Sequence, residues 1–122
     1  MTNTDWTQAT AIPTGELPEG ITTYLTAHRA RDLDTALAYY DDTSTVTDEG
    51  HTHTGRTAIR AWLADAASEY TYTTEVTGAA KLDDAHYDVL HHLEGNFPGG
   101  VADLHFRFAL RGEIIADLVI EP

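Results

Sequence analysis

The segment His86–Gly95, with the sequence HYDVLHHLEG, decides the fold, because apolar side chains recur along one of its two faces. This period of two is typical of a β-strand with one buried face. The segments Tyr70–Lys81, Val101–Leu110 and Glu113–Ile120 show the same period. Turn-forming residues separate the four segments, namely Asp83-Asp84, the stretch NFPGG at 96–100, and Arg111-Gly112. The second half of the chain is therefore predicted to form four consecutive antiparallel strands.

The first half of the chain has the helical period instead. Apolar side chains recur three and four positions apart from Ile21 to His28, and again over 59–66 after Gly55. Between these two helices, Asp32 can cap a short third one. Its apolar residues are Leu33, Leu37 and Tyr40. The segment 44–49 is predicted to be a strand, and 50–55 a loop or a short hairpin.

Helices followed by an antiparallel meander predict an α+β fold, with the helices packed on one face of a curved sheet. Such a sheet leaves a cavity between the two layers, which is a natural site for a small ligand. Residues 1–18 are polar and broken by proline and glycine, so we expect a mobile arm followed by one domain at 19–122. The arm lacks the features of a secretory signal, and we expect a cytoplasmic protein.

Composition and charge restrict the function further. The chain has 122 residues, of which 42% are hydrophobic, and this is enough for one domain with a buried core. Twenty Asp and Glu residues against seven Lys and Arg residues give a formal net charge of -13. Because such a surface repels phosphate backbones and anionic lipid headgroups, we expect neither a nucleic-acid nor a membrane partner. The absence of cysteine excludes thiol nucleophiles and cysteine-ligated zinc.

Five motifs then occur in a characteristic order. They are Arg31–Asp34 (RDLD), Val46–Asp48 (VTD), Gly55–Trp62 (GRTAIRAW), His105–Phe108 (HFRF) and the strand Gly112–Ile120. Together they resemble the nuclear transport factor 2-like domains, in particular the ketosteroid isomerases and the SnoaL-like polyketide cyclases. The resemblance implies a cone-shaped barrel, in which a strongly curved, mainly antiparallel sheet wraps around N-terminal helices as a cystatin-like roll. It also implies a homodimer. It leaves the function open, because this fold hosts enzymes and non-catalytic modules alike.

The resemblance implies roles for two residues. Asp48 matches the general base of the ketosteroid isomerases, which removes a proton α to a carbonyl. The alternative is a strand-end Asp that caps the following loop. Tyr24 matches the tyrosine of the isomerase oxyanion hole, whose hydroxyl donates a hydrogen bond to the developing enolate oxygen. The alternative is a tyrosine that only fills the core.

The third isomerase element, a protonated Asp, is replaced by Leu104. Asp103 lies one residue earlier and is predicted to face the opposite side of its strand. His91 shares the more apolar face of its own strand, so we expect it in the cavity as a proton shuttle or hydrogen-bond donor. A histidine satisfied by a neighbouring group is the alternative. His92 is expected to face outward.

Asp117 is a further candidate, because SnoaL-like cyclases carry acid–base residues on their last strand. Counting from Gly112 puts Asp117 on the inward phase. Asp48 and Asp117 would then share one cavity, which suits the activation of a water for epoxide hydrolysis. An Asp that faces solvent is the alternative. His28 lies one helical turn after Tyr24 and is expected to reach the same cavity.

The walls of the cavity are predicted to come from Trp62, Tyr72, Leu104, Phe106 and Val119, which suit a small hydrophobic carbonyl compound. We predict no cofactor, since the chain has neither a dinucleotide fingerprint nor a P-loop. The sequence His51-Thr52-His53 puts two imidazoles on one face, as in some metal sites. A solvated loop explains this pair better, and we predict no metal.

Three functions follow from these observations. The first is a cofactor-independent isomerase or cyclase with Asp48 as the base. The second is an epoxide-type hydrolase that uses Asp48 and Asp117. The third is a ligand-binding or dimeric scaffold module without catalysis.

Overall fold

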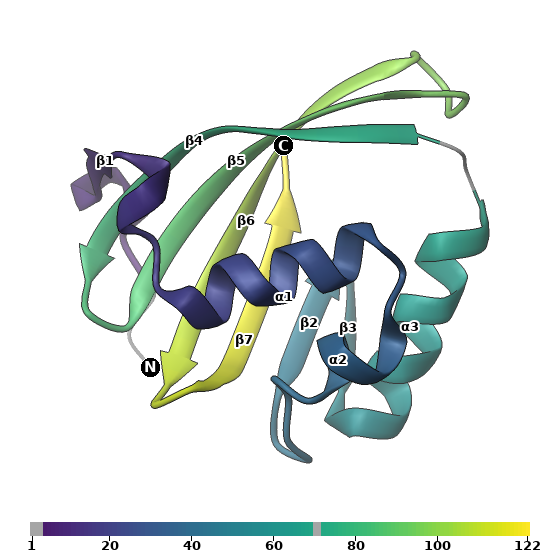
Figure 1. Cartoon of the computed structure of the whole chain (residues 1–122), viewed down its shortest axis with the longest axis horizontal. Helices are drawn as coiled ribbons and strands as arrows, with labels where there is room; N and C mark the ends of the chain where they lie inside the picture. The colour runs from purple at the N-terminus through teal and green to yellow at the C-terminus, as the bar shows by residue number, and fades with distance from the viewer. Residues whose placement is uncertain (1–3, 70–71) are drawn as a thin grey trace.

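The computed structural model describes residues 4–69 and 72–122. It has a seven-stranded sheet in the order β1-β4-β5-β6-β7-β2-β3, and all neighbouring strands are antiparallel except β2 and β7 (Figure 1). The strands are β1 (Thr10–Ile12), β2 (Thr45–Asp48), β3 (His51–Thr54), β4 (Tyr72–Asp83), β5 (His86–Gly95), β6 (Val101–Arg111) and β7 (Ile114–Glu121). The helices are η1 (Trp6–Gln8), η2 (Thr14–Glu16), α1 (Glu19–Arg29), α2 (Leu33–Leu37) and α3 (Gly55–Glu69).

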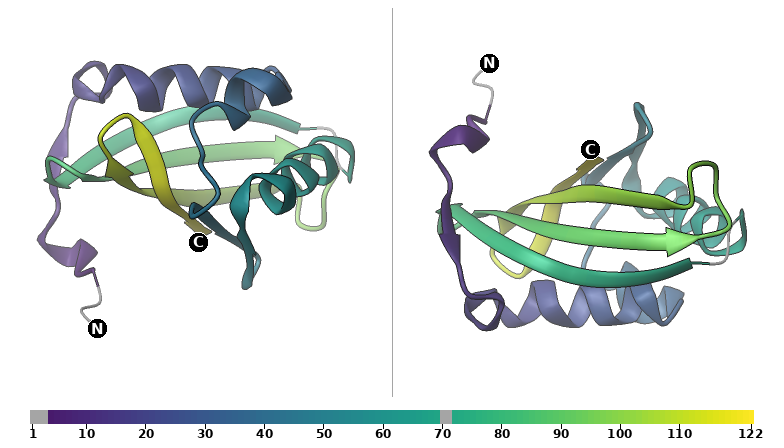
Figure 2. Two further views of the ribbon diagram at one scale, coloured as in Figure 1. Left: turned by 90° about the horizontal axis from the view of Figure 1, so that it is seen from below. Right: turned by 90° about the horizontal axis from the view of Figure 1, so that it is seen from above.

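The helices and the sheet form two layers, which confirms the predicted α+β class. Helix α1 runs along one face of the curved sheet, and α2 and α3 follow beside β2 and β3 (Figure 2). The four-stranded meander β4–β7 is confirmed, and β5 has the predicted bounds. No helix in the described part of the chain is both long and apolar enough to cross a membrane.

Two local sequences position the strand that carries Asp48. Glu49 and Gly50 both have positive φ, at 53° and 78°, as in the two-residue turns that suit the twist of β-hairpins. This turn joins β2 to β3. The segment 50–55, which the sequence predicts to be a loop or a short hairpin, is therefore part of a hairpin. Gly55 then starts α3 with φ 85°, and a Cβ there would lie 3.2 Å from the carbonyl oxygen of Asp42. A side chain at position 55 is therefore strained by both conformation and contact.

The segment before α1 is part of the domain rather than a free arm. β1 pairs with the edge of β4, and Leu17 is buried in the hydrophobic core. The ring of Trp6 lies edge-on to that of His86, and the guanidinium of Arg107 lies 5.7 Å from the centre of the Trp6 ring. Residues 6–17 therefore contact the rest of the domain through apolar and aromatic side chains that lie among the polar ones.

The core lies between α1 and the sheet. Its largest fully buried side chains include Tyr24, Tyr40 and Phe108. They are joined by apolar residues of β2 and β7 such as Val46 and Leu118. Helix α2 is capped as predicted, because the side chain of Asp32 accepts a hydrogen bond from the backbone N–H of Thr35. The core thus fixes α1 over the sheet face that carries the candidate site.

Candidate active site

A pocket opens between the C-terminal end of α1 and strands β4–β6. Helix α1 contributes Leu25, His28 and Arg29, and Arg31 follows just after the helix. The strands contribute Tyr72, Thr74, His91, Leu93 and Phe106. The cavity has a volume of about 60 Å³, which is room for about four to six water molecules at about 10–15 Å³ each. The pocket is therefore narrow in this conformation, and it reaches solvent beside the exposed side chains of Arg29 and Arg31.

The inner wall of the pocket is an aromatic stack. The imidazole of His28 stacks against Tyr24 on one side and Trp62 on the other, with ring centres 5.8 Å and 5.6 Å away. Phe106 lies 6.1 Å from His28 and 3.9 Å from His91, again between ring centres. The rings come from four elements, α1, α3, β5 and β6, which therefore meet at one aromatic cluster beside the pocket.

Both histidines of the pocket are neutral at pH 7. Burial lowers the pKa of His28 to about 4, and burial likewise lowers the pKa of His91 to about 4. The Nδ1 atom of His91 lies 3.2 Å from the carbonyl oxygen of Val89. Because a carbonyl oxygen only accepts, Nδ1 carries the hydrogen, and the other ring nitrogen of His91 is left with a lone pair. His91 is buried at 3% exposure and lines the pocket on the predicted face.

Asp48 is the last residue of β2, directly before the Glu49-Gly50 turn. It stands opposite Ile120 of β7, on the same face of the sheet as the buried Val46. Its Oδ2 atom accepts a hydrogen bond of 3.0 Å from the indole Nε1 of Trp62. Among the described residues no hydrogen bond reaches Oδ1. Asp48 therefore has one oriented oxygen and one oxygen that is free to accept a proton.

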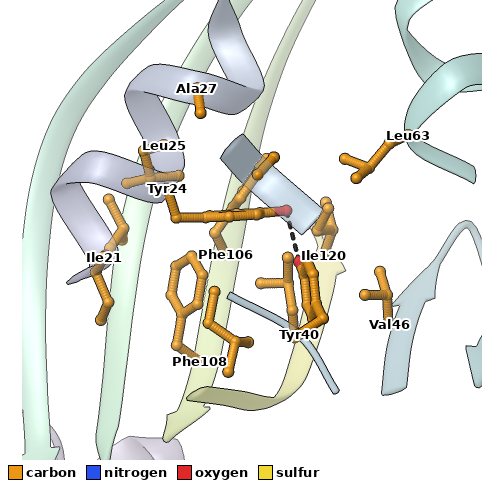
Figure 3. Packing of buried hydrophobic residues seen from close by; sticks show 14 of the residues in the cluster. Ile21, Tyr24, Leu25, Ala27, Tyr40, Val46, Leu63, Phe106, Phe108 and Ile120 are labelled. Carbon is orange, nitrogen blue, oxygen red and sulfur yellow. Dashed lines mark hydrogen bonds between the residues drawn. The ribbon is translucent and has the colours of Figure 1, made fainter. Parts of the chain in front are cut away.

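Tyr24 is paired with a second tyrosine in the core. The hydroxyl of Tyr40 donates to that of Tyr24 across 2.5 Å, and both side chains are almost completely buried (Figure 3). Burial raises the pKa of Tyr24, and the negative charge of Asp48 raises it further, against the opposing effect of the Tyr40 hydrogen bond. Since the Tyr24 oxygen accepts from Tyr40, its own hydrogen remains available for another acceptor.

The structure therefore separates the candidate residues into two groups. His28, His91, Tyr72 and Phe106 line the pocket. Asp48, Tyr24 and Trp62 do not line it, because the rings of Tyr24 and Trp62 stack on His28 and Asp48 is hydrogen-bonded to Trp62. Leu104 stands opposite His91 on the same sheet face and packs partly buried against the core. The charge of Asp48 still contributes to raising the pKa of Tyr72, after the larger effect of burial.

The prediction that Asp117 and Val119 face the cavity is wrong. Asp117 stands opposite Thr45, and its Oδ1 atom accepts a hydrogen bond of 2.6 Å from the Thr45 hydroxyl. Thr45 alternates with Val46 along β2, so Asp117 lies on the face opposite to Asp48, and Val119 lies there too.

The physical reason is a β-bulge. Ala109 pairs with Asp117 and Leu110 pairs with Ile115, so Ala116 is an extra residue in β7. Ile115 and Leu118 are both buried for this reason, and alternation counted from Gly112 changes phase between them. Asp48 and Asp117 therefore do not share a cavity, and the two-carboxylate hydrolase has no site.

The remaining polar candidates do not line the pocket. His92 is on the outer face, as predicted, where its Nδ1 is 2.7 Å from Asp103 and its Nε2 is 3.3 Å from Glu94. These two carboxylates raise the pKa of His92. His51 is exposed and stands opposite Asp48 in the hairpin. Within the described part of the chain, no group of three or more His, Cys, Asp or Glu side chains is placed to hold a metal ion.

Three site residues were missed from the sequence. The sequence pattern places Tyr40 only as an apolar position of the second helix, and its hydrogen bond to Tyr24 joins residues sixteen positions apart. Arg29 and Arg31 were given no role at the pocket, although they follow the helix stripe that ends at His28. A basic pair in an acidic chain is the signal that could have identified them.

Comparison with known proteins agrees with this architecture. The chain matches a candidate polyketide cyclase from Sinorhizobium meliloti with 27% identity and a TM-score of 0.83, over 90% of this chain and 100% of that one. A Mycobacterium tuberculosis protein in complex with estradiol-17β-hemisuccinate is 14% identical, with a TM-score of 0.70 over 84% and 90% of the two chains. The ketosteroid isomerase of a Mycobacterium species is also 14% identical, with a TM-score of 0.69 over 84% and 89%.

These likenesses confirm the nuclear transport factor 2-like, cystatin-like fold that the motifs predict. No curated protein matches the chain. Residues 21–117, most of the chain, match the family described as the SnoaL-like domain. The chain therefore belongs to the SnoaL-like domain family.

Proposed function

We propose that this protein is a cofactor-independent enzyme that removes a proton from the carbon next to the carbonyl of a small hydrophobic compound. Asp48 is the base in this proposal, and Tyr24 donates a hydrogen bond to the carbonyl oxygen. The observation that carries the proposal is the environment of Asp48, which stands on the inner sheet face with one oxygen held by Trp62 and the other without a hydrogen-bond partner among the described residues. A carboxylate held in this way suits proton abstraction.

The steps follow from the hydrogen-bonding atoms. Oδ1 of Asp48 takes the α-proton, the electron pair of the C–H bond forms a C=C bond, and the π electrons of the carbonyl move to its oxygen to give an enolate. The Tyr24 hydroxyl stabilises this oxygen, and Tyr40 supports Tyr24 from behind. The protonated Asp48 then returns the proton to another carbon, which completes an isomerisation. Alternatively, the enolate carbon attacks a second carbonyl of the same molecule, and the protonated Asp48 returns its proton to the alkoxide that forms there, which completes an aldol cyclisation.

The narrow pocket implies a movement on substrate binding. A polycyclic compound is larger than the cavity of about 60 Å³, and Asp48 does not line this cavity. His28, which does line it, stacks on Trp62, and Trp62 in turn is hydrogen-bonded to Asp48. We propose that the ring of His28 turns aside when substrate enters. The binding of a steroid derivative by a protein of the same fold supports a ligand of this hydrophobic class.

A second candidate function is ligand binding without catalysis. It is favoured by one observation, namely that neither Asp48 nor Tyr24 lines the pocket in this conformation. The two functions differ in whether a bound carbonyl compound loses a proton.

The test is exchange of α-protons with deuterated water, followed by NMR on a panel of β,γ-unsaturated ketones and 1,3-diketones. We expect the parent protein to accelerate exchange for at least one compound and the Asp48→Asn variant to lose this acceleration. Circular dichroism checks that the variant is folded. Tight binding with no exchange by the parent protein would instead establish the binding module.

A further inference from the structure

We propose that the pocket selects hydrophobic compounds that carry a carboxylate, which Arg29 and Arg31 hold at the pocket mouth. This inference rests on the proposed function, and it specifies the substrate as an acid whose carbonyl end enters the pocket while its carboxylate stays at the mouth.

The distribution of charge sets this pocket apart from the rest of the surface. The chain has 20 acidic and only 7 basic residues, yet two of the seven, Arg29 and Arg31, line the pocket, and no Asp or Glu does. Four other basic residues are ion-paired with carboxylates, and these are Arg60, Lys81, Arg107 and Arg111. Within the described residues, Arg29 and Arg31 form no ion pair. They are therefore free to pair with an anion.

Arg31 stands at the end of α1 in a backbone conformation that usually favours glycine. The N–H of Asp32 donates to the carbonyl of Ala27 across 2.9 Å, and the N–H of Arg31 donates to that of His28 across 3.2 Å. These bonds form the motif that ends many helices with a glycine. Arg31 occupies the glycine position with φ 60°, a conformation that costs an L-residue about 1–2 kcal/mol. The chain therefore retains a strained arginine where glycine fits better.

The lining of the pocket changes from charged to apolar with depth. Arg29 and Arg31 are exposed at the mouth, whereas Leu25 and Phe106 are buried further in. His91 is neutral, and the charge of Arg29 adds to the effect of burial in lowering its pKa. The positive charge at the mouth therefore belongs to the two guanidinium groups. Guanidinium groups bind carboxylates through paired, charge-assisted hydrogen bonds.

The test compares two ligands of nearly equal shape, 1-naphthaleneacetate and 1-naphthaleneacetamide, by isothermal titration calorimetry at pH 7.5 and low salt. We expect the carboxylate to bind about tenfold or more tightly than the amide, since hydrogen bonds to charged groups are the stronger ones. Arg29→Gln and Arg31→Gln should each reduce this preference, and the double variant should abolish it. Arg56→Gln is the matched control, because it removes one exposed charge that does not line the pocket.

The Arg31→Gly variant distinguishes loss of the guanidinium group from loss of folding as the cause of weaker binding. It should raise the unfolding temperature by relieving the strain at position 31 and still weaken binding of the carboxylate. Equal affinities for the two ligands in the parent protein, or an unchanged preference in the double variant, would overturn the inference. The Asp48→Asn variant should keep the preference, because Asp48 does not line the pocket. The experiments therefore distinguish failure of the proposed function, seen as no α-proton exchange, from failure of this inference, seen as no preference for the carboxylate ligand.

Discussion

The indole Nε1 of Trp62 donates a hydrogen bond to Oδ2 of Asp48 across 3.0 Å, which joins α3 to the end of β2 at the candidate base. The same indole ring stacks on His28. Trp62 therefore holds the carboxylate and also contacts His28, which lines the pocket. This dual contact makes Trp62 a positioning residue for the proposed reaction.

Trp62→Phe should separate these two contributions. Phe retains an aromatic ring for His28 but cannot donate to Asp48, so we expect about tenfold slower α-proton exchange and a free energy of unfolding about 1–2 kcal/mol lower. Exchange by NMR and urea denaturation measure the two effects. Trp6→Phe is the control, because Trp6 contacts His86 and Arg107 away from the pocket. Equal exchange rates in the two variants would show that the indole N–H has no positioning role.

The hydrogen bond from Tyr40 to Tyr24 predicts that Tyr24→Phe and Tyr40→Phe differ in their effect on the exchange rate. Tyr24→Phe removes the proposed donor to the enolate oxygen and leaves the Tyr40 hydroxyl without its acceptor. We expect the exchange rate to fall by about 10² and the free energy of unfolding to fall by about 1–3 kcal/mol. Tyr40→Phe retains the donor, so its exchange rate should fall by less. If Tyr40→Phe is the slower of the two, the assignment of Tyr24 as the donor is incorrect.

The buried histidines predict a loss of stability in mild acid. Each has a pKa of about 4 in the folded protein, whereas an unfolded chain binds protons on histidine below about pH 6.5. Protons therefore favour the unfolded chain between pH 6.5 and 4, and each imidazole should lower the free energy of unfolding by about 2 kcal/mol between pH 7 and 5. His92 acts in the opposite direction, since its carboxylate partners raise its pKa.

Urea denaturation at pH 7 and pH 5 measures this effect, with His91→Gln as the comparison. The variant lacks one of the two imidazoles, so its stability should depend less steeply on pH than that of the parent protein. Identical pH dependence would mean that folding does not lower the pKa of His91.

His28→Ala should open the pocket toward Asp48. Removal of the ring leaves space between Tyr24 and Trp62, at a cost of about 2 kcal/mol or more in the free energy of unfolding. If His28 turns aside for substrate, the KM of a bicyclic ketone should fall while that of a small acyclic ketone changes little. Steady-state kinetics on the two ketones measures this split. An equal change in both KM values would contradict a gating role for His28.

Much of the fold was predictable because local patterns agree with the tertiary structure. The strand 86–95 alternates without interruption and is bounded by turn residues, so its limits and the inward direction of His91 are as predicted. Asp117 was misplaced because the extra residue Ala116 reverses the alternation, and no turn residue marks this bulge. The bond from Tyr40 to Tyr24 also escapes sequence patterns, since it depends on how α1 lies over the sheet.

Asp48 and Asp117 lie on opposite faces of the sheet. A comparison of variants at these two positions is therefore the most direct test of the central claim, that Asp48 removes the α-proton. The measurement is the rate of α-proton exchange for one accepted ketone in Asp48→Asn and in Asp117→Asn. These variants make the same chemical change on adjacent strands, but only one is on the inner face. We predict that Asp48→Asn slows exchange by about 10² or more, whereas Asp117→Asn stays close to the parent rate. Equal rates in the two folded variants would contradict the account.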